Sequence, residues 1–270
     1  MYFAGVDIGS LTTKVCIIDF EGKPVAYVIR KTTAKIKEAS EDAFKECLRK
    51  AGLKPSDIRY IVATGYGRNL AVSTFANEKI TEITCHSRGA KFLFPKCHTV
   101  IDVGGQDSKV MRLNDDGRVL KFTMNDKCAA GTGRFLEVMA DALEIRLEEM
   151  GGLSLKSKSR IQITSTCTVF AESEVISLIA SGGNPVDIVA GLHEAIAKRI
   201  SGLVKQVGAE KDIVMTGGVA KNIGVVKALE REIKHRIRVP SEPQIVGAIG
   251  AALMAREKAS DSGRPPKKRR

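Results

Sequence analysis

Two stretches of the chain carry residue types, at one repeated spacing, that suit phosphate and divalent-cation chemistry. They are VDIGSLTTK at residues 6–14 and IDVGGQDSK at residues 101–109. Each is an apolar run that ends on an aspartate, turns on glycine and resumes as a second strand. A glycine turn brings backbone N–H groups close to phosphate oxygens, and an aspartate at a strand end can hold Mg²⁺ through the waters that this ion retains. We therefore expect two similar lobes that grip one nucleotide.

Two further segments extend the pattern toward the C-terminus. The run VMTGGVAKN at residues 214–222 predicts a strand, a glycine turn and a helix start, whose exposed N–H groups favour polar or anionic ligands. Small side chains recur over residues 246–253, in a predicted final helix. The sequence contains neither a P-loop nor a complete GxGxxG motif. This order of segments resembles the actin, hexokinase and chaperone ATPase superfamily, in which ATP lies in a cleft between two ribonuclease-H-like α/β lobes.

That resemblance implies a role for each segment. Asp7 and Asp102 would hold Mg²⁺ and the attacking water, and Gln106 would contact the γ-phosphate or that water. These three residues are the expected catalytic groups. The residues expected to contact the nucleotide are Ser10, Leu11, Thr12, Thr13, Lys14, Gly104, Gly105, Gly217, Gly218, Asn222 and Gln244.

The spacing of the six cysteines, with gaps of 31, 38, 12, 31 and 39 residues, excludes CxxC redox motifs and zinc ribbons. Cys16 and Cys47 follow apolar strand and helix patterns and are predicted to lie in the core. The Cys85-His86 and Cys97-His98 pairs give only a weak indication of zinc, and we expect no metal there.

Cys128 and Cys167 differ, because each lies in a small, polar stretch just ahead of a predicted helix. The positive end of a helix favours a thiolate and an anionic ligand. Two thiolates do not complete an iron–sulfur cluster, which ordinarily takes four, but a symmetric dimer would supply four around its two-fold axis. From the residues alone, a bridging cluster and a pair of structural or reactive thiols both remain open.

The segments around both cysteines resemble those of a known family. NDKCAAGTGRF at 125–135 and STCTVFAESE at 165–174 are similar to signatures of the activators of 2-hydroxyacyl-CoA dehydratases, within the BadF/BadG/BcrA/BcrD ATPases. So are ATGYGRN at 63–69 and VMTGGVA at 214–220, and the resemblance covers roughly residues 2–255. It implies a homodimer that binds one 4Fe–4S cluster through Cys128 and Cys167 of each chain.

The same resemblance implies an oxygen-sensitive ATPase that transfers single electrons. Reduced ferredoxin or flavodoxin would load the cluster, and ATP with Mg²⁺ would shift the helices that follow the cysteines. The electron would then pass to a 2-hydroxyacyl-CoA dehydratase. Three alternatives remain: an ATPase subunit of a benzoyl-CoA reductase, a sugar or acyl-phosphate kinase of the same fold, and a cluster-free chaperone-like ATPase. The sequence does not identify the acyl-CoA, the electron donor or the cluster potential.

Composition narrows the other possibilities. The net charge of +12 is compatible with nucleic-acid binding. However, a large part of it lies in residues 256–270, which hold seven basic and two acidic residues. The rest is of mixed sign, so we expect no nucleic-acid partner. No apolar run approaches the ~20 residues that span a bilayer, and no signal peptide is recognised. We expect a cytoplasmic protein without membrane association.

The elements that must position these residues follow from hydrophobic periodicity. Strands are predicted at 2–8, 13–20, 24–30, 59–63, 99–103, 109–113, 119–124, 160–164 and 212–215, and helices at 38–51, 135–147, 169–180, 185–207 and 245–258. Gly52 is the expected C-cap of the first helix. The predicted divisions are a first lobe at 1–97, a second lobe with the cluster segments at 98–258, and a disordered basic tail at 259–270.

Overall fold

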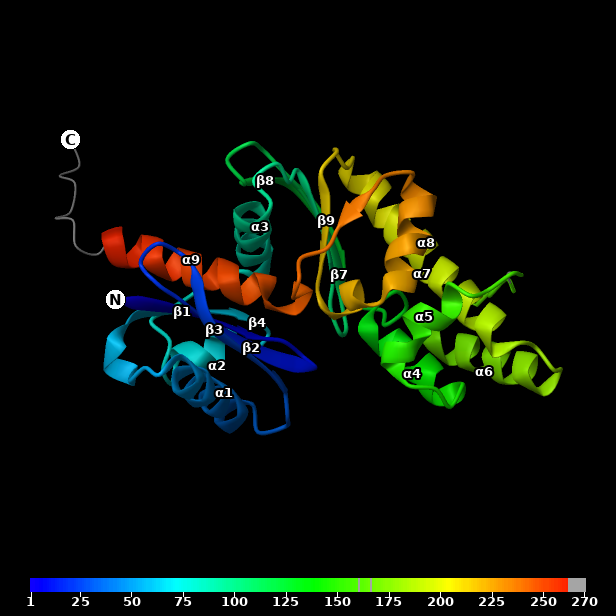
Figure 1. Ribbon diagram of the computed structural model, residues 1–270, viewed down its shortest axis with the longest axis horizontal. Coiled ribbons are helices and arrows are strands. Elements are labelled where there is room, and N and C mark those ends of the chain that lie inside the picture. Colours follow the sequence, from blue (N-terminus) through cyan, green and yellow to red (C-terminus); the bar gives the residue numbers. More distant parts are fainter. Residues whose placement is uncertain (160, 166, 262–270) are drawn as a thin grey trace. The chain divides into compact units, whose positions relative to one another are not determined.

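The computed structural model describes residues 1–159, 161–165 and 167–261, which form two compact units. The first unit comprises Met1–Pro95 and the C-terminal segment from Gln244, and the second comprises Lys96–Pro243. Each contains a five-stranded sheet with helices packed on it (Figure 1). The strands of the first sheet are β1 (Tyr2–Ile8), β2 (Thr12–Ile18), β3 (Pro24–Lys31), β4 (Ile58–Gly65) and β5 (Glu78–Lys79). Those of the second are β6 (Thr99–Val103), β7 (Ser108–Leu113), β8 (Val119–Asn125), β9 (Ile213–Thr216) and β10 (Ile237–Arg238).

The two sheets have the same topology. The first has the order β3-β2-β1-β4-β5 and the second β8-β7-β6-β9-β10. In each sheet the three strands that come first along the chain pair antiparallel, and the last two add in parallel. The predicted pair of similar α/β lobes is therefore confirmed.

Helices cover both faces of the first sheet. Helices α1 (Ile36–Ala51) and α2 (Arg68–Val72) lie on one face, and α3 (Glu82–Leu93) with α9 (Val246–Asp261) on the other (Figure 1). Along β1, Val6 and Ile8 join the core beneath α1, whereas Phe3 joins the core beneath α9. A strand that is buried on both faces has a continuous apolar sequence, which is why β1 could be predicted. The predicted C-cap of α1 is also confirmed, because Gly52 has a left-handed φ of 68°.

The last helix corrects the predicted division of the chain. The sequence pattern places residues 244–258 in the second lobe, but α9 packs on β1, β4 and α3 of the first unit. The approach is close, because a Cβ at Gly250 would lie 2.9 Å from the Gly89 backbone nitrogen. Residues 259–261, predicted to begin the tail, continue α9. Residues 262–270 of the predicted tail lie outside the described residues.

The second unit has one continuous core beneath α7 (Pro185–Val207) and α8 (Ile223–Ile233). Three shorter helices adjoin it: α4 (Gly133–Ala142), α5 (Met150–Ser154) and α6 (Thr168–Ala180) (Figure 1). Buried side chains of α4, α6 and α7 meet there, among them Met139, Val175 and Leu192. The two cysteine segments therefore belong to a single packed body with the second sheet.

Two predictions in this unit are wrong. The strand expected at 160–164 does not form: Ile161–Ser165 pair with no strand, and Ile161 and Ile163 instead pack beside Gly191 of α7, while Arg160 lies outside the described residues. The helix expected at 135–147 ends at Ala142, because Glu144 adopts a left-handed φ of 53°. Over the described ranges, no helix combines the length and the apolar character needed to cross a bilayer.

Candidate functional site

The first glycine turn places an ion pair at the ends of β1 and β2. Asp7 and Lys14 are cross-strand neighbours, and the Lys14 Nζ lies 3.2 Å from the Asp7 Oδ2. The Asp7 side chain is 6% exposed and that of Lys14 is 14% exposed. Each charge thus has one partner, and Lys14 retains limited access to solvent.

Thr32 closes this turn from the neighbouring strand end. Its hydroxyl donates to the Gly9 carbonyl oxygen at 2.9 Å and lies 2.9 Å from the Thr13 hydroxyl. The Thr32 N–H donates to the Leu11 carbonyl at 2.8 Å. Thr13 is fully buried, so its side chain supports the turn, whereas Ser10, Leu11 and Thr12 are half-buried at its open side. Nothing in the spacing of the sequence singles out Thr32.

The second glycine turn carries a denser cluster of charge. The Lys109 Nζ lies 2.6 Å from the Asp107 Oδ1 and 3.4 Å from the Asp102 Oδ2. The other oxygen of Asp102 accepts a hydrogen bond from the Thr216 hydroxyl at 2.8 Å. All four residues are buried. Two carboxylates therefore share one ammonium group, and the charges of these three side chains sum to about −1.

The two turns correspond position by position. Asp102 and Lys109 are cross-strand neighbours, as Asp7 and Lys14 are. Behind each aspartate lies a left-handed glycine, Gly65 (φ 79°) or Gly217 (φ 86°), where a Cβ would lie within about 3 Å of an aspartate oxygen. The one charged residue without a charged counterpart is Asp107, which occupies the position that Thr12 has in the first turn.

This excess of carboxylate suits a divalent cation. Mg²⁺ usually keeps several waters and is bound through one or two carboxylates together with phosphate oxygens. Asp102 and Asp107 supply those carboxylates in the second unit, whereas Asp7 is already balanced by Lys14. Within residues 1–159, 161–165 and 167–261, no group of three His, Cys, Asp or Glu side chains gathers to hold a metal.

The third turn lies against the second. Gly217 backs onto the Val103 carbonyl, and Gly218–Lys221 form a short 3₁₀ helix that leads to Asn222. The Asn222 Oδ1 caps α8 by accepting from the Val225 N–H at 3.1 Å. Asp102, the Gly104-Gly105 turn and Gly217 therefore lie together. Gln244 belongs to the other unit, in the short 3₁₀ turn that precedes α9.

Asn222 has a buried partner that the sequence did not indicate. Its Nδ2 lies 3.2 Å from the Nε2 of His193 on α7. Burial, and to a lesser degree the charge of Arg231, lowers the pKa of His193 to about 4. The imidazole is therefore neutral near pH 7, and its Nε2 accepts from the Asn222 amide.

The six cysteines divide into two classes. Cys16, Cys47, Cys85 and Cys97 are buried, and Cys128 and Cys167 are not. Burial raises the pKa of the Cys47 and Cys85 thiols to about 12. The predicted core positions of Cys16 and Cys47 are confirmed.

Each accessible cysteine precedes a helix, as predicted, and the two helices pack on each other. Cys167 is the N-cap of α6, and Cys128 lies in the loop that leads to α4. Helices α4 and α6 are in contact. Glu174, whose role the sequence did not reveal, reaches back from α6 and accepts hydrogen bonds from the N–H groups of Thr164 at 2.9 Å and Ser165 at 2.8 Å. Burial opposes ionisation of Glu174, but these bonds outweigh it and lower the pKa of its carboxyl group.

The first turns of α6 expose apolar side chains. Val169 is 65% and Phe170 68% exposed, and Ile176 is 53% exposed one to two turns further along. Neighbouring exposed apolar side chains of this kind mark a candidate interaction surface. The exposed stripe begins two residues after Cys167.

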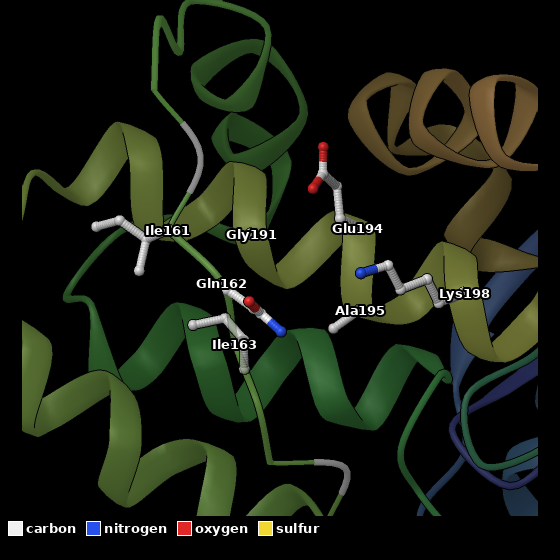
Figure 2. A pocket seen from close by; sticks show the side chains of 7 residues that line it. All are labelled: Ile161, Gln162, Ile163, Gly191, Glu194, Ala195 and Lys198. Carbon is white, nitrogen blue, oxygen red and sulfur yellow. The ribbon is translucent and has the colours of Figure 1, made fainter.

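A separate pocket of about 200 Å³ lies between the Ile161–Ile163 segment and α7. Figure 2 shows the Gln162 amide and the Lys198 ammonium extending toward each other across it, with Glu194 at its side. Glu194 lies 3.9 Å from Arg231. This pocket is lined by mixed charges and by none of the predicted nucleotide residues.

The sequence pattern of the BadF/BadG/BcrA/BcrD ATPase family matches residues 4–255. The chain belongs to this family. One relative is the (R)-2-hydroxyglutaryl-CoA dehydratase activating ATPase of Acidaminococcus fermentans, 45% identical over 96% of this chain and 99% of that protein. Another family member, one of the subunits of the benzoyl-CoA reductase from Thauera aromatica, is 34% identical over 93% of this chain and 91% of its own length.

A solved structure shares the whole fold. The activator of 2-hydroxyisocaproyl-CoA dehydratase from Clostridium difficile, with bound ADPNP, is 45% identical, covers 100% of both chains and superposes with a TM-score of 0.94. The actin-like ATPase fold predicted for this family member is thereby confirmed.

Proposed function

We propose that this protein is an ATP-dependent one-electron activator of a 2-hydroxyacyl-CoA dehydratase. The observation that carries the proposal is the pair of accessible cysteines, each just ahead of one of two helices that pack together. The first of these helices is hydrogen-bonded to the Gly104-Gly105 turn. The similarity to two dehydratase activators, each about 45% identical over nearly the whole chain, supports the same function.

The cysteine chemistry fits an iron–sulfur cluster shared by two chains. Cys128 and Cys167 are the two cysteines with solvent access, and a 4Fe–4S cluster ordinarily takes four thiolates. A two-fold dimer supplies Cys128 and Cys167 from each protomer. When bound, the cluster stores the single electron that ferredoxin or flavodoxin provides and that the dehydratase receives.

The chain's own residues bind and orient the nucleotide. Lys14 and the half-buried Ser10, Leu11 and Thr12 offer donors to phosphate oxygens, and Asp102 and Asp107 would hold Mg²⁺. Gln106 is exposed at the tip of the second turn, in a position to orient the attacking water. Gly217 lets its turn pack against the Val103 carbonyl, where adenosine would pass close to Gly217 and Gly218, and Asn222 holds the adjoining helix in place.

A benzoyl-CoA reductase-type subunit is the second candidate, favoured by the 34% identity to one such protein. It predicts stable co-purification with other subunits, whereas an activator binds its dehydratase transiently. Purification from the native cells separates the two.

The experiment that tests the proposal measures iron and acid-labile sulfide per dimer after anaerobic purification. About four irons per dimer are expected in the wild type, with loss in both Cys128→Ser and Cys167→Ser. Cys97→Ala, at a buried position, is the matched control and should retain the iron. A wild type that binds no iron even after reconstitution refutes the activator and leaves a kinase of this fold as the leading hypothesis.

A further inference from the structure

Two peptide groups connect the Gly104-Gly105 turn to the start of α4. The Gly104 carbonyl accepts from the Gly133 N–H at 2.9 Å, and the Gly105 carbonyl accepts from the Arg134 N–H at 2.8 Å. Gly133 and Arg134 are the first two residues of α4, whose N–H groups have no acceptor within the helix. The turn therefore supplies the acceptors that the beginning of α4 lacks.

The same two peptide groups present their N–H bonds on the opposite side. A trans peptide is planar, so its C=O and N–H bonds point in opposite directions. The Gly104 carbonyl shares its peptide with the Gly105 N–H, and the Gly105 carbonyl with the Gln106 N–H. In the described part of the chain, neither N–H donates to a protein acceptor. Both are available to a phosphate oxygen on the side of the turn that faces away from α4.

The loop between Cys128 and α4 is tightly held. The Asn125 Nδ2 donates to the Cys128 carbonyl at 2.8 Å, and the Ser108 hydroxyl donates to the Gly131 carbonyl at 2.8 Å. Ser108 and Asn125 are cross-strand neighbours at the ends of β7 and β8. The Cys128 loop is therefore hydrogen-bonded to the strands that follow the turn, and only residues 129–132 separate Cys128 from the start of α4.

Cys167 is held by a different set of contacts. Its segment is bound by Glu174 of α6 through Thr164 and Ser165. Among the described residues, no hydrogen bond joins positions 161–175 to either glycine turn. The two cysteines thus differ in their connection to the phosphate site.

We propose that the terminal phosphate of the nucleotide acts on Cys128 through hydrogen bonds and reaches Cys167 only through the packing of α6 on α4. A phosphate on the Gly105 and Gln106 N–H groups polarises the two peptides, because hydrogen bonds in a chain strengthen one another. It thereby strengthens the hydrogen bonds that their carbonyl groups accept from α4, and so changes the conformation of the Cys128 loop. A nucleotide shifts a conformation only through differential affinity, and this contact distinguishes a triphosphate from a diphosphate. The inference rests on the proposed function for the nucleotide and the cluster, and adds which ligand responds.

Amide hydrogen exchange on the full-length protein tests this asymmetry. Exchange is followed in peptides covering 126–136 and 167–175, without nucleotide, with Mg·ADP and with a non-hydrolysable Mg·ATP analogue. The analogue, relative to ADP, should slow exchange in 126–136 by roughly threefold or more. Exchange in 167–175 should change by a smaller factor, so that segment is the internal comparison.

Two variants at Gly133 isolate the hydrogen bond. Gly133→Pro removes the N–H at a position where proline is compatible with a helix, and Thr132 already has the extended backbone that precedes proline (φ −125°, ψ 174°). It should abolish the analogue's effect on 126–136, and nucleotide binding is measured in parallel because the proline Cδ also pushes on the Gly104 carbonyl. Gly133→Ala keeps the N–H, places its Cβ 3.2 Å from the Gly104 oxygen and should retain the effect.

A third variant weakens the hydrogen bonds that hold the segment before Cys167. Glu174→Gln should speed exchange in 167–175 in every nucleotide state without altering the response of 126–136. Glu172→Gln on the same helix is its matched control and should change neither segment.

Each contrary result is decisive. Equal responses of both segments in the wild type, or no response while the analogue binds, overturn the proposal even if Gly133→Pro does not fold. A Gly133→Pro protein that retains the response overturns the hydrogen-bonded route. The iron assay tests the cluster hypothesis separately. The exchange experiment tests only the connection between the phosphate and α4.

Discussion

The charge of the Asp102–Asp107–Lys109 cluster predicts how strongly the protein depends on Mg²⁺. Lys109 lies 2.6 Å from Asp107 and 3.4 Å from Asp102, and all three side chains are at most 6% exposed. The wild-type cluster has a net charge of about −1. Asp107→Asn makes it neutral, Lys109→Met makes it −2, and the double variant returns it to −1.

Coulomb's law gives the size of the effect. One unit charge about 6 Å from a divalent ion contributes about 1.4 kcal/mol at the dielectric constant of water and about 5.5 kcal/mol at an effective value of 20. Each 1.4 kcal/mol is a tenfold change in affinity. Asp107→Asn should therefore raise the Mg²⁺ concentration needed for nucleotide binding at least about tenfold, and Lys109→Met should lower it.

The assay is a Mg²⁺ titration of nucleotide binding, followed with a fluorescent ATP analogue. The double variant should recover the wild-type midpoint, because it restores the net charge without restoring either side chain. Asp116→Asn, in the exposed β7–β8 turn, is the control for loss of a surface carboxylate. A double variant no better than Asp107→Asn, or an Asp107→Asn midpoint within twofold of the wild type, refutes the charge argument.

Two further predictions concern stability. His193 has a folded pKa of about 4 against 6.5 unfolded, so its neutral form contributes stability that is complete above pH 6.5 and is lost as pH falls toward 4. Urea unfolding at about pH 5 should show a loss of about 2 kcal/mol relative to neutral pH, and His193→Gln should remove that part of the slope; a parallel slope would show that other groups cause it. Gly250→Val should destabilise by at least about 1–3 kcal/mol, because its Cβ would meet the Cys85 and Gly89 backbones. Gly202→Ala in α7, where a Cβ meets nothing within 4 Å, should instead be neutral or stabilising, and equal losses would contradict the packing argument.

The parts of the fold that the sequence predicted are those with strong local patterns. Strands such as β1 and β6 are buried runs closed by a glycine turn, and α1 shows clear helical spacing with a glycine cap. The strand predicted at 160–164 was wrong because Ile161 and Ile163 alternate as in a strand yet pack against a helix. Periodicity records which side chains are buried and does not record what buries them.

The site residues that the sequence predicted are likewise those in strong local motifs. Asp7, Asp102 and both accessible cysteines stand in recognisable motifs, so their types and spacing indicated them. The groups that hold them in place did not stand out: Thr32 bonds across 23 residues to Gly9, and His193 across 29 residues to Asn222. Glu174 lies within a quoted motif, yet its role depends on how its segment folds back. Long-range partners carry no periodic signal.

The position of α9 affects the order in which the two units complete their folding during synthesis. The second unit is one uninterrupted stretch, Lys96–Pro243, and all of it is translated before the segment from Gln244. The first sheet emerges earlier but waits for α9 to cover one of its faces. Until then Phe3, Cys16 and Val62 are without the helix that buries them. The half of the protein that is synthesised first is therefore the half that finishes folding last, and a chain that stalls near its end leaves an apolar sheet face for chaperones to guard.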